Sequence, residues 1–289
     1  MRALPLSLTL LLASIPALAN AATANRARQD VRQQAVHQVQ HAAAADQPWS
    51  LAMGAGLGMA PLYEGSRAYN LSPLPYLQGT WTSQSLGQFS LGNAGLGWTP
   101  LGNEQWQATL LLAPDSGRHE TFSHSNLRGT DADRNHLAGI SAIHSTLEAG
   151  IALQYQVATL GFSLQAMQDV LERGHKGIWI DLGVARAFEL TPRWSSSVNL
   201  QTRWADSDYM QSLFGVDDRQ AANSGFARYA PGAGIKSVSL GGTLNYAVSD
   251  HWMLVMMLNG SELVGDAGRS PIVQQRFMLS SALGSAYRF

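Results

Sequence analysis

The chain has 289 residues, a formal net charge of -1 at pH 7 and no cysteine, and only 13% of its residues are charged. Soluble domains carry about a quarter of charged residues, so this composition favours a protein with surface that faces lipid. The balanced charge argues against a nucleic-acid-binding protein. The absence of cysteine excludes disulfides, thiolate metal sites and a cysteine nucleophile.

The first 21 residues have the pattern of a secretory signal peptide. Arg2 provides a positive start, residues 4–18 form a short apolar run, and Ala19-Asn20-Ala21 is a small-x-small cleavage site. A helix needs about 20 apolar residues to cross a bilayer, and neither this run nor any later stretch reaches that length. We therefore predict an exported protein whose signal peptide is removed and whose mature part has no transmembrane helix.

Residues 22–47 are rich in Ala, Gln and Arg and contain few large apolar side chains. The stripe formed by Val31, Ala35, Val36 and Val39 is too thin for a helix that packs firmly on a domain. We predict a short periplasmic leader here, either helical or disordered.

From Trp49 onward, apolar residues alternate with polar ones, as in strands whose two faces meet different surroundings. In residues 143–157 every odd position is apolar apart from Ser145. The opposite faces hold mostly Ser, Thr, Gln, Asn and Gly, without the charge density of a sheet in water, so they suit a barrel lumen. The alternation recurs, with varying clarity, in segments 49–59, 71–81, 106–112, 160–166, 178–188, 194–204, 238–248, 252–258 and 277–289.

The predicted fold is all-β: a transmembrane antiparallel up-and-down β-barrel over residues 48–289, in the outer membrane of a Gram-negative cell. A weak Gly-rich hairpin in residues 86–98 raises the expected strand number from about 10 to about 12, and we favour 12; both are even, as bacterial barrels require. Short periplasmic turns are expected at 83–85, 101–102, 158, 191–192 and 249–250, and long external loops at 61–70, 114–134, 206–236 and 265–275.

The glycine and serine motifs do not predict a catalytic or cofactor site. Gly54-x-Gly56-x-Gly58 lacks the following helix and the acidic partner of a dinucleotide-binding fingerprint, so we interpret these glycines as small residues on the lumen face. No Gly-x-Ser-x-Gly nucleophile elbow occurs. We expect a protein that is not an enzyme and that needs no cofactor.

Histidines and aspartates gather in the predicted loop before residue 146, where a metal site would be conceivable. The spacing of His119, His124, His136 and His144 fits no standard set of ligands. The segment 131–133 carries two aspartates but lacks the Gly and the closing Glu of a calcium loop. We interpret the histidines as ordinary loop residues and the aspartates as a solvated turn, so no metal is expected.

The external segment 206–236 is the most informative loop. Asp217 or Asp218 is placed to cap a short helix through Ala222, and Gly225 is placed to end it. The rest of the loop is too apolar for a solvated tip, so it either folds back over the barrel mouth or forms a recognition surface. The candidate recognition residues, in this loop and in the first external loop, are Tyr63, Glu64, Asp206, Asp208, Tyr209, Met210 and Phe214.

Several short motifs of the barrel region resemble those of a known protein family. They are Tyr63-Glu64-Gly65-Ser66, Pro73-Leu74-Pro75, Arg193-Trp194-Ser195, Trp204-Ala205-Asp206-Ser207-Asp208-Tyr209-Met210-Gln211, Phe214-Gly215-Val216, Ala233-Gly234-Ile235-Lys236, Ser249-Asp250-His251-Trp252, Gly265-Asp266-Ala267, Ser270-Pro271-Ile272-Val273 and Tyr287-Arg288-Phe289. In these motifs the sequence resembles the MipA/OmpV family of outer-membrane proteins, the MltA-interacting proteins, whereas the leader is longer and richer in Gln than in that family.

The resemblance implies an outer-membrane barrel whose best-described member scaffolds a complex between a lytic murein transglycosylase and a bifunctional murein synthase. Other members look more like surface antigens or permeability factors. The resemblance also implies contact with outer-membrane lipid and with the barrel assembly machinery, for which the aromatic end at Tyr287 and Phe289 would be the signal. It supplies no catalytic residue.

We therefore expect a non-enzymatic scaffold for murein-synthesising and lytic enzymes. A narrow pore for small solutes and a surface adhesin or antigen are the alternatives. The scaffold hypothesis has a physical difficulty, because short turns offer little area, whereas a stable interface buries about 800 Å² per partner. The leader 22–47 would have to contribute to such an interface.

Overall fold

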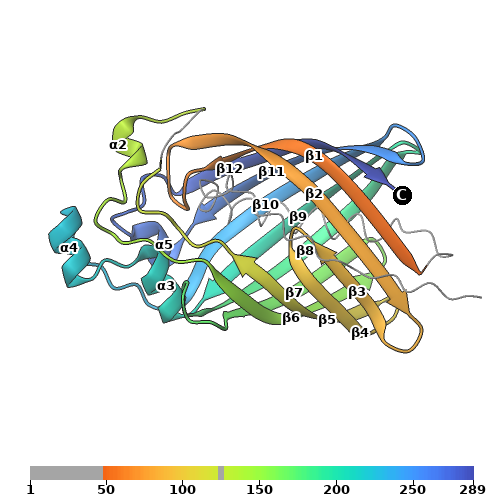
Figure 1. Cartoon of the computed structure of the whole chain (residues 1–289), viewed down its shortest axis with the longest axis horizontal. Coiled ribbons are helices and arrows are strands. Elements are labelled where there is room, and N and C mark those ends of the chain that lie inside the picture. Colours follow the sequence, from red (N-terminus) through yellow and green to blue (C-terminus); the bar gives the residue numbers. More distant parts are fainter. Residues whose placement is uncertain (1–47, 123–126) are drawn as a thin grey trace, which may run out of the picture.

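A computed structural model describes residues 48–122 and 127–289, so the predictions for residues 1–47 lie outside the described part. The strands form one closed antiparallel barrel in which β1 pairs with β12 and every other strand pairs with its neighbours in sequence (Figure 1). The prediction of 12 strands is confirmed, and the weak Gly-rich hairpin does form β3 and β4. The strands are β1 (Trp49–Pro61), β2 (Tyr69–Ser83), β3 (Gly87–Gly92), β4 (Gly95–Gly102), β5 (Trp106–Asp115), β6 (Thr146–Val157), β7 (Leu160–Asp169), β8 (Ile178–Thr191), β9 (Trp194–Ala205), β10 (Gly234–Ala247), β11 (Trp252–Leu263) and β12 (Phe277–Arg288).

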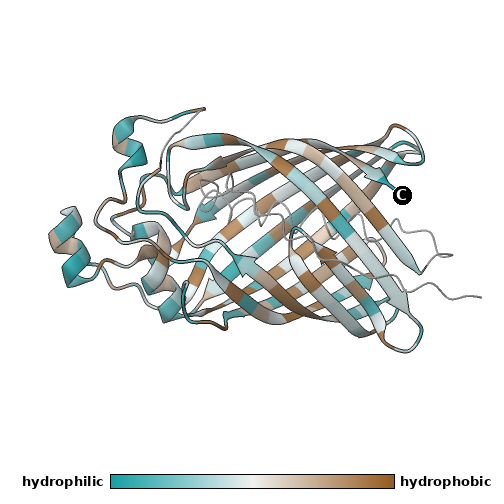
Figure 2. Ribbon diagram, viewed as in Figure 1, coloured by the Kyte–Doolittle hydropathy of each residue, from teal (hydrophilic) through white to brown (hydrophobic). Residues whose placement is uncertain are grey.

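The alternation along each strand separates a lipid-facing surface from the lumen. On β6, Ile151, Leu153 and Tyr155 are exposed on the outside of the barrel, whereas Ala152 between them is buried. Figure 2 shows the result as bands of hydrophobic and hydrophilic residues that alternate along the strands. Exposed tryptophans gather near one end of the barrel, where outer-membrane barrels carry an aromatic girdle; they are Trp49, Trp81, Trp98, Trp106, Trp194 and Trp252.

The two ends of the barrel differ. The connections are short at the end where Phe289 donates its backbone N–H to Leu51, and we call this the periplasmic end, after the sidedness of such barrels. The long connections lie at the opposite, outer end, together with all the described helices (Figure 1). These helices are α2 (Asp131–Arg134), α3 (Ser207–Phe214), α4 (Asp218–Ser224) and α5 (Gly265–Arg269). None of them is long and apolar enough to span a membrane.

Two details differ from the predicted connections. Residues 170–177 form a further outer loop between β7 and β8, which the alternation did not reveal. The strand β4 continues through Gly102, so the next turn lies at 103–105, just after the predicted 101–102. By contrast, the short helix predicted from Asp217 or Asp218 through Ala222 does form, as α4, and it continues to Ser224. Asp217 is the cap, because it accepts a hydrogen bond from the backbone N–H of Gln220, and Gly225 ends the helix in the left-handed conformation.

The barrel wall has its shortest strands at β3 and β4, which have only 6 and 8 residues. The strand β3 pairs with β2 only from Gln78 to Ser83. Beyond this pairing, the side chain of Asn93 in the β3–β4 turn bonds to the backbone of Leu77 and Pro75, and Tyr69 forms an isolated β-bridge with Arg128.

Candidate functional site

The outer end of the lumen is filled by α3, which we call the plug. Asp206 caps this helix by accepting a hydrogen bond of 2.9 Å from the backbone N–H of Tyr209. The apolar face of the helix is buried among lumen side chains of several strands. The loop therefore folds back into the barrel mouth (Figure 1). The buried plug residues are Tyr209, Met210, Leu213 and Phe214, and the lumen residues around them are Ala113, Met167, Trp179, Ala205, Leu263 and Met278.

Above the plug, the outer loops share a small hydrophobic core. It joins loops that are far apart in the sequence through Leu62, Tyr63, Ala68, Leu137, Ile140, Val216 and Ile272. The hydroxyl of Tyr63 donates to the backbone carbonyl of Ile272 at 3.3 Å, and burial raises the pKa of Tyr63 well above its ordinary value. The loops are therefore one packed cap rather than separate solvated tips.

Asp133 of α2 is part of this cap, and its interpretation as a solvated turn was wrong. The side chain is buried, and its carboxylate accepts hydrogen bonds from Arg67 at 2.7 Å and from Gln274 at 2.9 Å. Burial alone would raise the pKa of Asp133, but the hydrogen bonds from Thr130, Arg67 and Gln274 outweigh it and hold this pKa well below its usual range. The residue thus ties α2 to two other loops.

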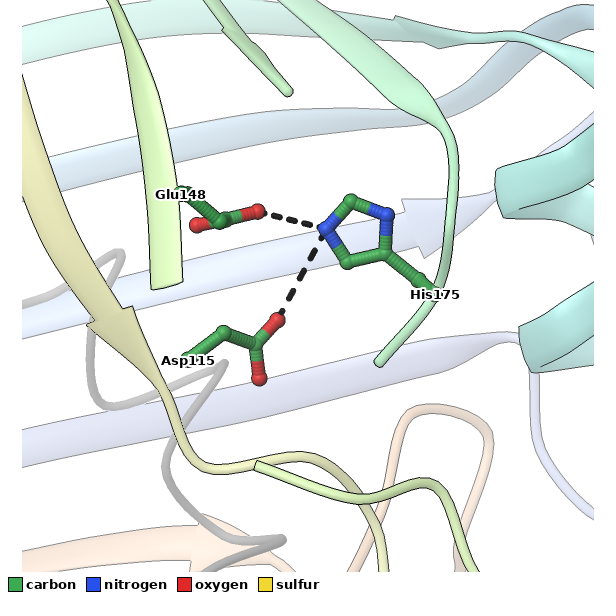
Figure 3. A group of neighbouring side chains, drawn as sticks. All are labelled: Asp115, Glu148 and His175. Carbon is green, nitrogen blue, oxygen red and sulfur yellow. Dashed lines mark hydrogen bonds and ion pairs between the residues drawn. The ribbon is translucent and has the colours of Figure 1, made fainter. Parts of the chain in front are cut away.

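In contact with the plug lies a cluster of three buried titratable residues, which we call the polar cluster: Asp115, Glu148 and His175 (Figure 3). Both carboxylates point at the Nε2 atom of His175, which lies 2.6 Å from Glu148 Oε1 and 3.9 Å from Asp115 Oδ2. Trp179 also donates its indole N–H to Glu148 Oε1 at 2.7 Å. The centre of the His175 ring lies 4.6 Å from that of the Tyr209 ring, so the plug is in contact with the cluster.

The hydrogen bonds of His175 decide where its proton lies. The backbone N–H of Gly177 donates to Nδ1 at 3.1 Å, so Nδ1 is an acceptor, and Nε2 carries the proton that Glu148 accepts. One imidazole nitrogen and two carboxylate oxygens within 4.8 Å of one another form a donor set that suits Zn²⁺ and related ions. A cation on Nε2 would move the proton to Nδ1, toward the N–H of Gly177. The geometry therefore fits a hydrogen-bonded cluster that holds β6, β8 and the β7–β8 loop together better than it fits a metal centre.

Two ion pairs lie near the plug. The Nζ atom of Lys236 lies 2.7 and 3.0 Å from the two carboxylate oxygens of Glu64 and 3.4 Å from the Tyr209 hydroxyl. Arg203 makes a bidentate pair with Asp181, with both bonds at 2.6 Å, and its guanidinium lies 4.1 Å from the Trp179 ring centre. Buried charges are tolerated in such surroundings only when they are paired.

The residues predicted for a recognition surface divide between these structures. Tyr63 lies in the loop core, Glu64 pairs with Lys236, and Asp206 caps the plug. Tyr209, Met210 and Phe214 are buried in the plug, whereas Asp208 is exposed. A recognition role for these residues stays a prediction.

The two residues of the predicted assembly signal lie at the periplasmic end. The rings of Tyr287 and Phe289 meet edge to face at 4.8 Å. Their recognition by the assembly machinery also stays a prediction.

The sequence did not point to Asp115, Glu148 or His175. Of the four histidines considered for a metal site, His124 lies outside the described residues. The other three are not part of the cluster: His119 is half-buried in the loop after β5, His136 packs against Tyr63 in the loop core, and His144 is exposed. A signal was present, since Glu148 is an acid on a lumen face that is otherwise almost uncharged. Lumen-facing carboxylates near the outer strand ends are therefore candidates for contacts with the outer loops.

The closed barrel, its apolar outer belt, its tryptophan girdle and its plugged mouth define an integral β-barrel of the bacterial outer membrane. The sequence matches the family described as MltA-interacting protein MipA over residues 53–289, and the chain belongs to this family. Membership confirms the outer-membrane location and the resemblance noted in the sequence.

Among individual proteins, the chain is 25% identical over 162 residues to YiaT of Escherichia coli (strain K12), whose description assigns it to the outer membrane. The match covers 55% of this chain and 64% of the relative, so the chain matches less than two thirds of the relative's length.

The chain is also similar, at low TM-scores, to solved structures. The NanC porin is 11% identical with a TM-score of 0.42, and the match covers 82% of this chain and 98% of the porin. The translocator domain of the autotransporter NalP from Neisseria meningitidis is 10% identical with a TM-score of 0.45, covering 93% of this chain and 99% of that domain. We transfer no function from either.

Proposed function

We propose that the protein is a non-enzymatic scaffold of the outer membrane that holds murein-modifying enzymes at its periplasmic end. The closed outer mouth is the observation that carries this proposal. The plug, the polar cluster and the pair of Lys236 with Glu64 occupy the route that a solute would take through the barrel. A barrel that is firmly closed outside offers its periplasmic end to other envelope proteins.

The family description, MltA-interacting protein, supports a lytic transglycosylase as one partner. A bifunctional murein synthase is the second partner that we propose, from the resemblance of the sequence motifs. The periplasmic connections of the described barrel are short, so they offer much less than the roughly 800 Å² that a stable interface buries per partner. We therefore propose that residues 22–47 complete the binding surface.

The test is a crosslinked pull-down of the tagged protein from intact envelopes, with and without residues 22–47, followed by mass spectrometry. The scaffold proposal expects a lytic transglycosylase or murein synthase with the full chain and a strong loss after the deletion. A folded barrel that recovers only assembly factors in both forms would contradict it. Heat-modifiable gel mobility checks that the deleted form has folded.

A narrow pore is the second candidate, and the chemistry of the lumen below the plug favours it. A cavity of about 70 Å³ there is lined by neutral amide and hydroxyl side chains and by small apolar ones, a surface that suits small uncharged solutes. Single-channel recordings of the wild type and of a variant with residues 207–232 replaced by a short Gly-Ser turn test this function. Conductance in either form supports a pore, and none in both contradicts it.

A further inference from the structure

The lipid-facing surface of the barrel carries an apolar groove of about 650 Å³ that extends from β5 to β10. We call it the lipid groove. Its volume falls within the range of about 300–1,000 Å³ that small-molecule sites have. Most of its lining comes from two neighbouring rows of cross-strand partners, in which each residue occupies a lipid-facing position of its strand. In β7, β8 and β9 these residues are Phe162, Val184 and Leu200 in one row and Leu164, Leu182 and Thr202 in the next.

A charged residue borders the lipid groove on its periplasmic side. Arg186 of β8 belongs to the adjacent row, where its cross-strand partners are Leu160 and Val198. It lies two positions from Val184 and two from Phe188, so its side chain leaves the barrel on the lipid side, where it is exposed. Its guanidinium lies 5.0 Å from the centre of the Phe188 ring, which is nearer the periplasmic end. The Arg186 side chain therefore bends toward the membrane–water interface, as long basic side chains in lipid do.

Arg186 stands alone on this surface. The lipid-facing positions of the described strands hold no other Lys or Arg, and among the described residues no carboxylate forms an ion pair with Arg186. An arginine that faces lipid is costly at the middle of the bilayer but is tolerated near the interface. A guanidinium there can donate two parallel hydrogen bonds to a phosphate. A group that binds phosphate therefore lies at the end of an apolar groove, which matches the two parts of a phospholipid.

A second groove on the lipid-facing surface has nearly the same size but no charge beside it. It measures about 660 Å³ and extends over β1 to β5, and we call it the uncharged groove. These five strands contain no charged residue except Asp115, which is buried in the polar cluster. The rings of Trp81, Phe89 and Trp98 stack along this groove, so its lining is apolar and aromatic. The uncharged groove can accept any acyl chain, whereas the lipid groove also offers a partner for an anion.

We propose that the lipid groove with Arg186 is a binding site for an anionic phospholipid of the periplasmic leaflet, such as phosphatidylglycerol. An acyl chain lies in the groove, and the phosphate accepts hydrogen bonds from the Arg186 guanidinium at the interface. A zwitterionic head group would also bring an ammonium group, and β7, β8 and β9 hold no lipid-facing carboxylate to receive it. The site is reached from the membrane, so it is independent of the plug and of any periplasmic partner.

The probe is a phosphatidylglycerol with a diazirine in one acyl chain, present at low mole fraction in phosphatidylethanolamine vesicles that contain the full-length protein. A diacylglycerol with the same labelled chain is the matched neutral probe, and mass spectrometry maps the labelled residues. The proposal expects the phosphatidylglycerol probe to label Leu182 and Leu200 in the lipid groove far more than Leu91 and Leu110 in the uncharged groove. It expects the diacylglycerol probe to label both grooves alike. Equal labelling of the two grooves by phosphatidylglycerol would overturn the proposal, and so would the same preference in both probes.

Matched variants separate the phosphate contact from folding. Arg186→Gln is expected to lower phosphatidylglycerol labelling of the lipid groove about tenfold, the effect of losing one hydrogen-bonded charge contact. The same variant should leave diacylglycerol labelling unchanged, and Arg186→Lys, which keeps the charge, should retain most of the phosphatidylglycerol labelling. The control is Arg193→Gln in the exposed β8–β9 turn, which should label like the wild type. With folded gel mobility in every variant, full labelling in Arg186→Gln or an equal loss in Arg193→Gln would overturn the proposal.

Discussion

Lys236 Nζ lies 2.7 Å from Glu64 Oε1, although the two residues are 172 positions apart in the chain. The Lys236 side chain is 2% exposed and that of Glu64 is 12% exposed. The pair joins the first outer loop to β10, and the Tyr209 hydroxyl brings the plug into the same contact at 3.4 Å. This ion pair therefore helps to close the outer mouth, together with the packing of the plug and of the loop core.

Replacement of Glu64 by Gln should destabilise the closed mouth strongly. It removes the carboxylate that the buried Lys236 ammonium contacts at 2.7 Å, and the loss of one partner of a buried ion pair costs about 3 kcal/mol or more. Urea unfolding of the refolded barrel in lipid vesicles measures the loss. The control is Asp218→Asn, which removes the pair of Asp218 with Arg228, whose side chains are 79% and 69% exposed; we expect a loss below about 1 kcal/mol. Similar losses in the two variants would contradict the buried pairing.

Gly54→Ala should weaken closure of the barrel. Gly54 of β1 faces β12, and a methyl group on it would overlap the backbone carbonyl oxygen of Ser285. Overpacking of this kind costs roughly 1–3 kcal/mol, and we expect a lower yield of folded barrel in a refolding assay. The control is Gly79→Ala on β2, where the nearest atom to the added methyl group would be 3.9 Å away. An equal yield for both variants would show that the β1–β12 seam can adjust.

Leu153→Arg should destabilise the barrel by about 2–4 kcal/mol if this residue lies near the middle of the bilayer, because its side chain faces lipid. Gln154→Arg should be much milder, since Gln154 faces the lumen. The free energies of unfolding in vesicles compare these adjacent positions on one strand. Equal losses would mean that the two faces of β6 are assigned incorrectly.

The packed outer loops should loosen as the pH falls below about 6.5. The His136 ring stacks 6.3 Å from the Tyr63 ring and lies 5.1 Å from Phe226, and burial lowers the pKa of His136. His136 therefore binds a proton more readily when the loops are open than when they are packed. The stability that neutral His136 confers is complete above its ordinary pKa of about 6.5 and is lost as the pH falls toward the lowered value.

Amide hydrogen exchange at pH 7.5 and 5.5, corrected for the intrinsic rate, measures this loosening in the loops and in the strands. We expect a change in the loops alone, and we expect His136→Phe to abolish it. Asp133 does not contribute in this window, because its lowered pKa removes stability only at pH values below its ordinary pKa of about 3.9. The same pH response in the His136→Phe variant would show that another group controls the loops.

Much of the fold was predictable from the sequence, because strand facing depends on local chemistry. Each residue of a barrel strand meets either lipid or lumen, and this choice alternates with a period of two, so the pattern around Leu153 and Gln154 could be read without the fold. Helix caps are equally local, and Asp217 with Gly225 predicted α4. In contrast, the apolar residues of the plug had two interpretations, and only packing against other strands distinguished them.

The sequence by itself determined the barrel, the alternation of its two faces and its family motifs, and it favoured 12 strands over 10. Only the tertiary structure decided which lumen residues meet, because this depends on the register between strands and on where each loop folds back. The polar cluster joins β5, β6 and the β7–β8 loop, and no spacing along the chain predicts that Asp115, Glu148 and His175 converge.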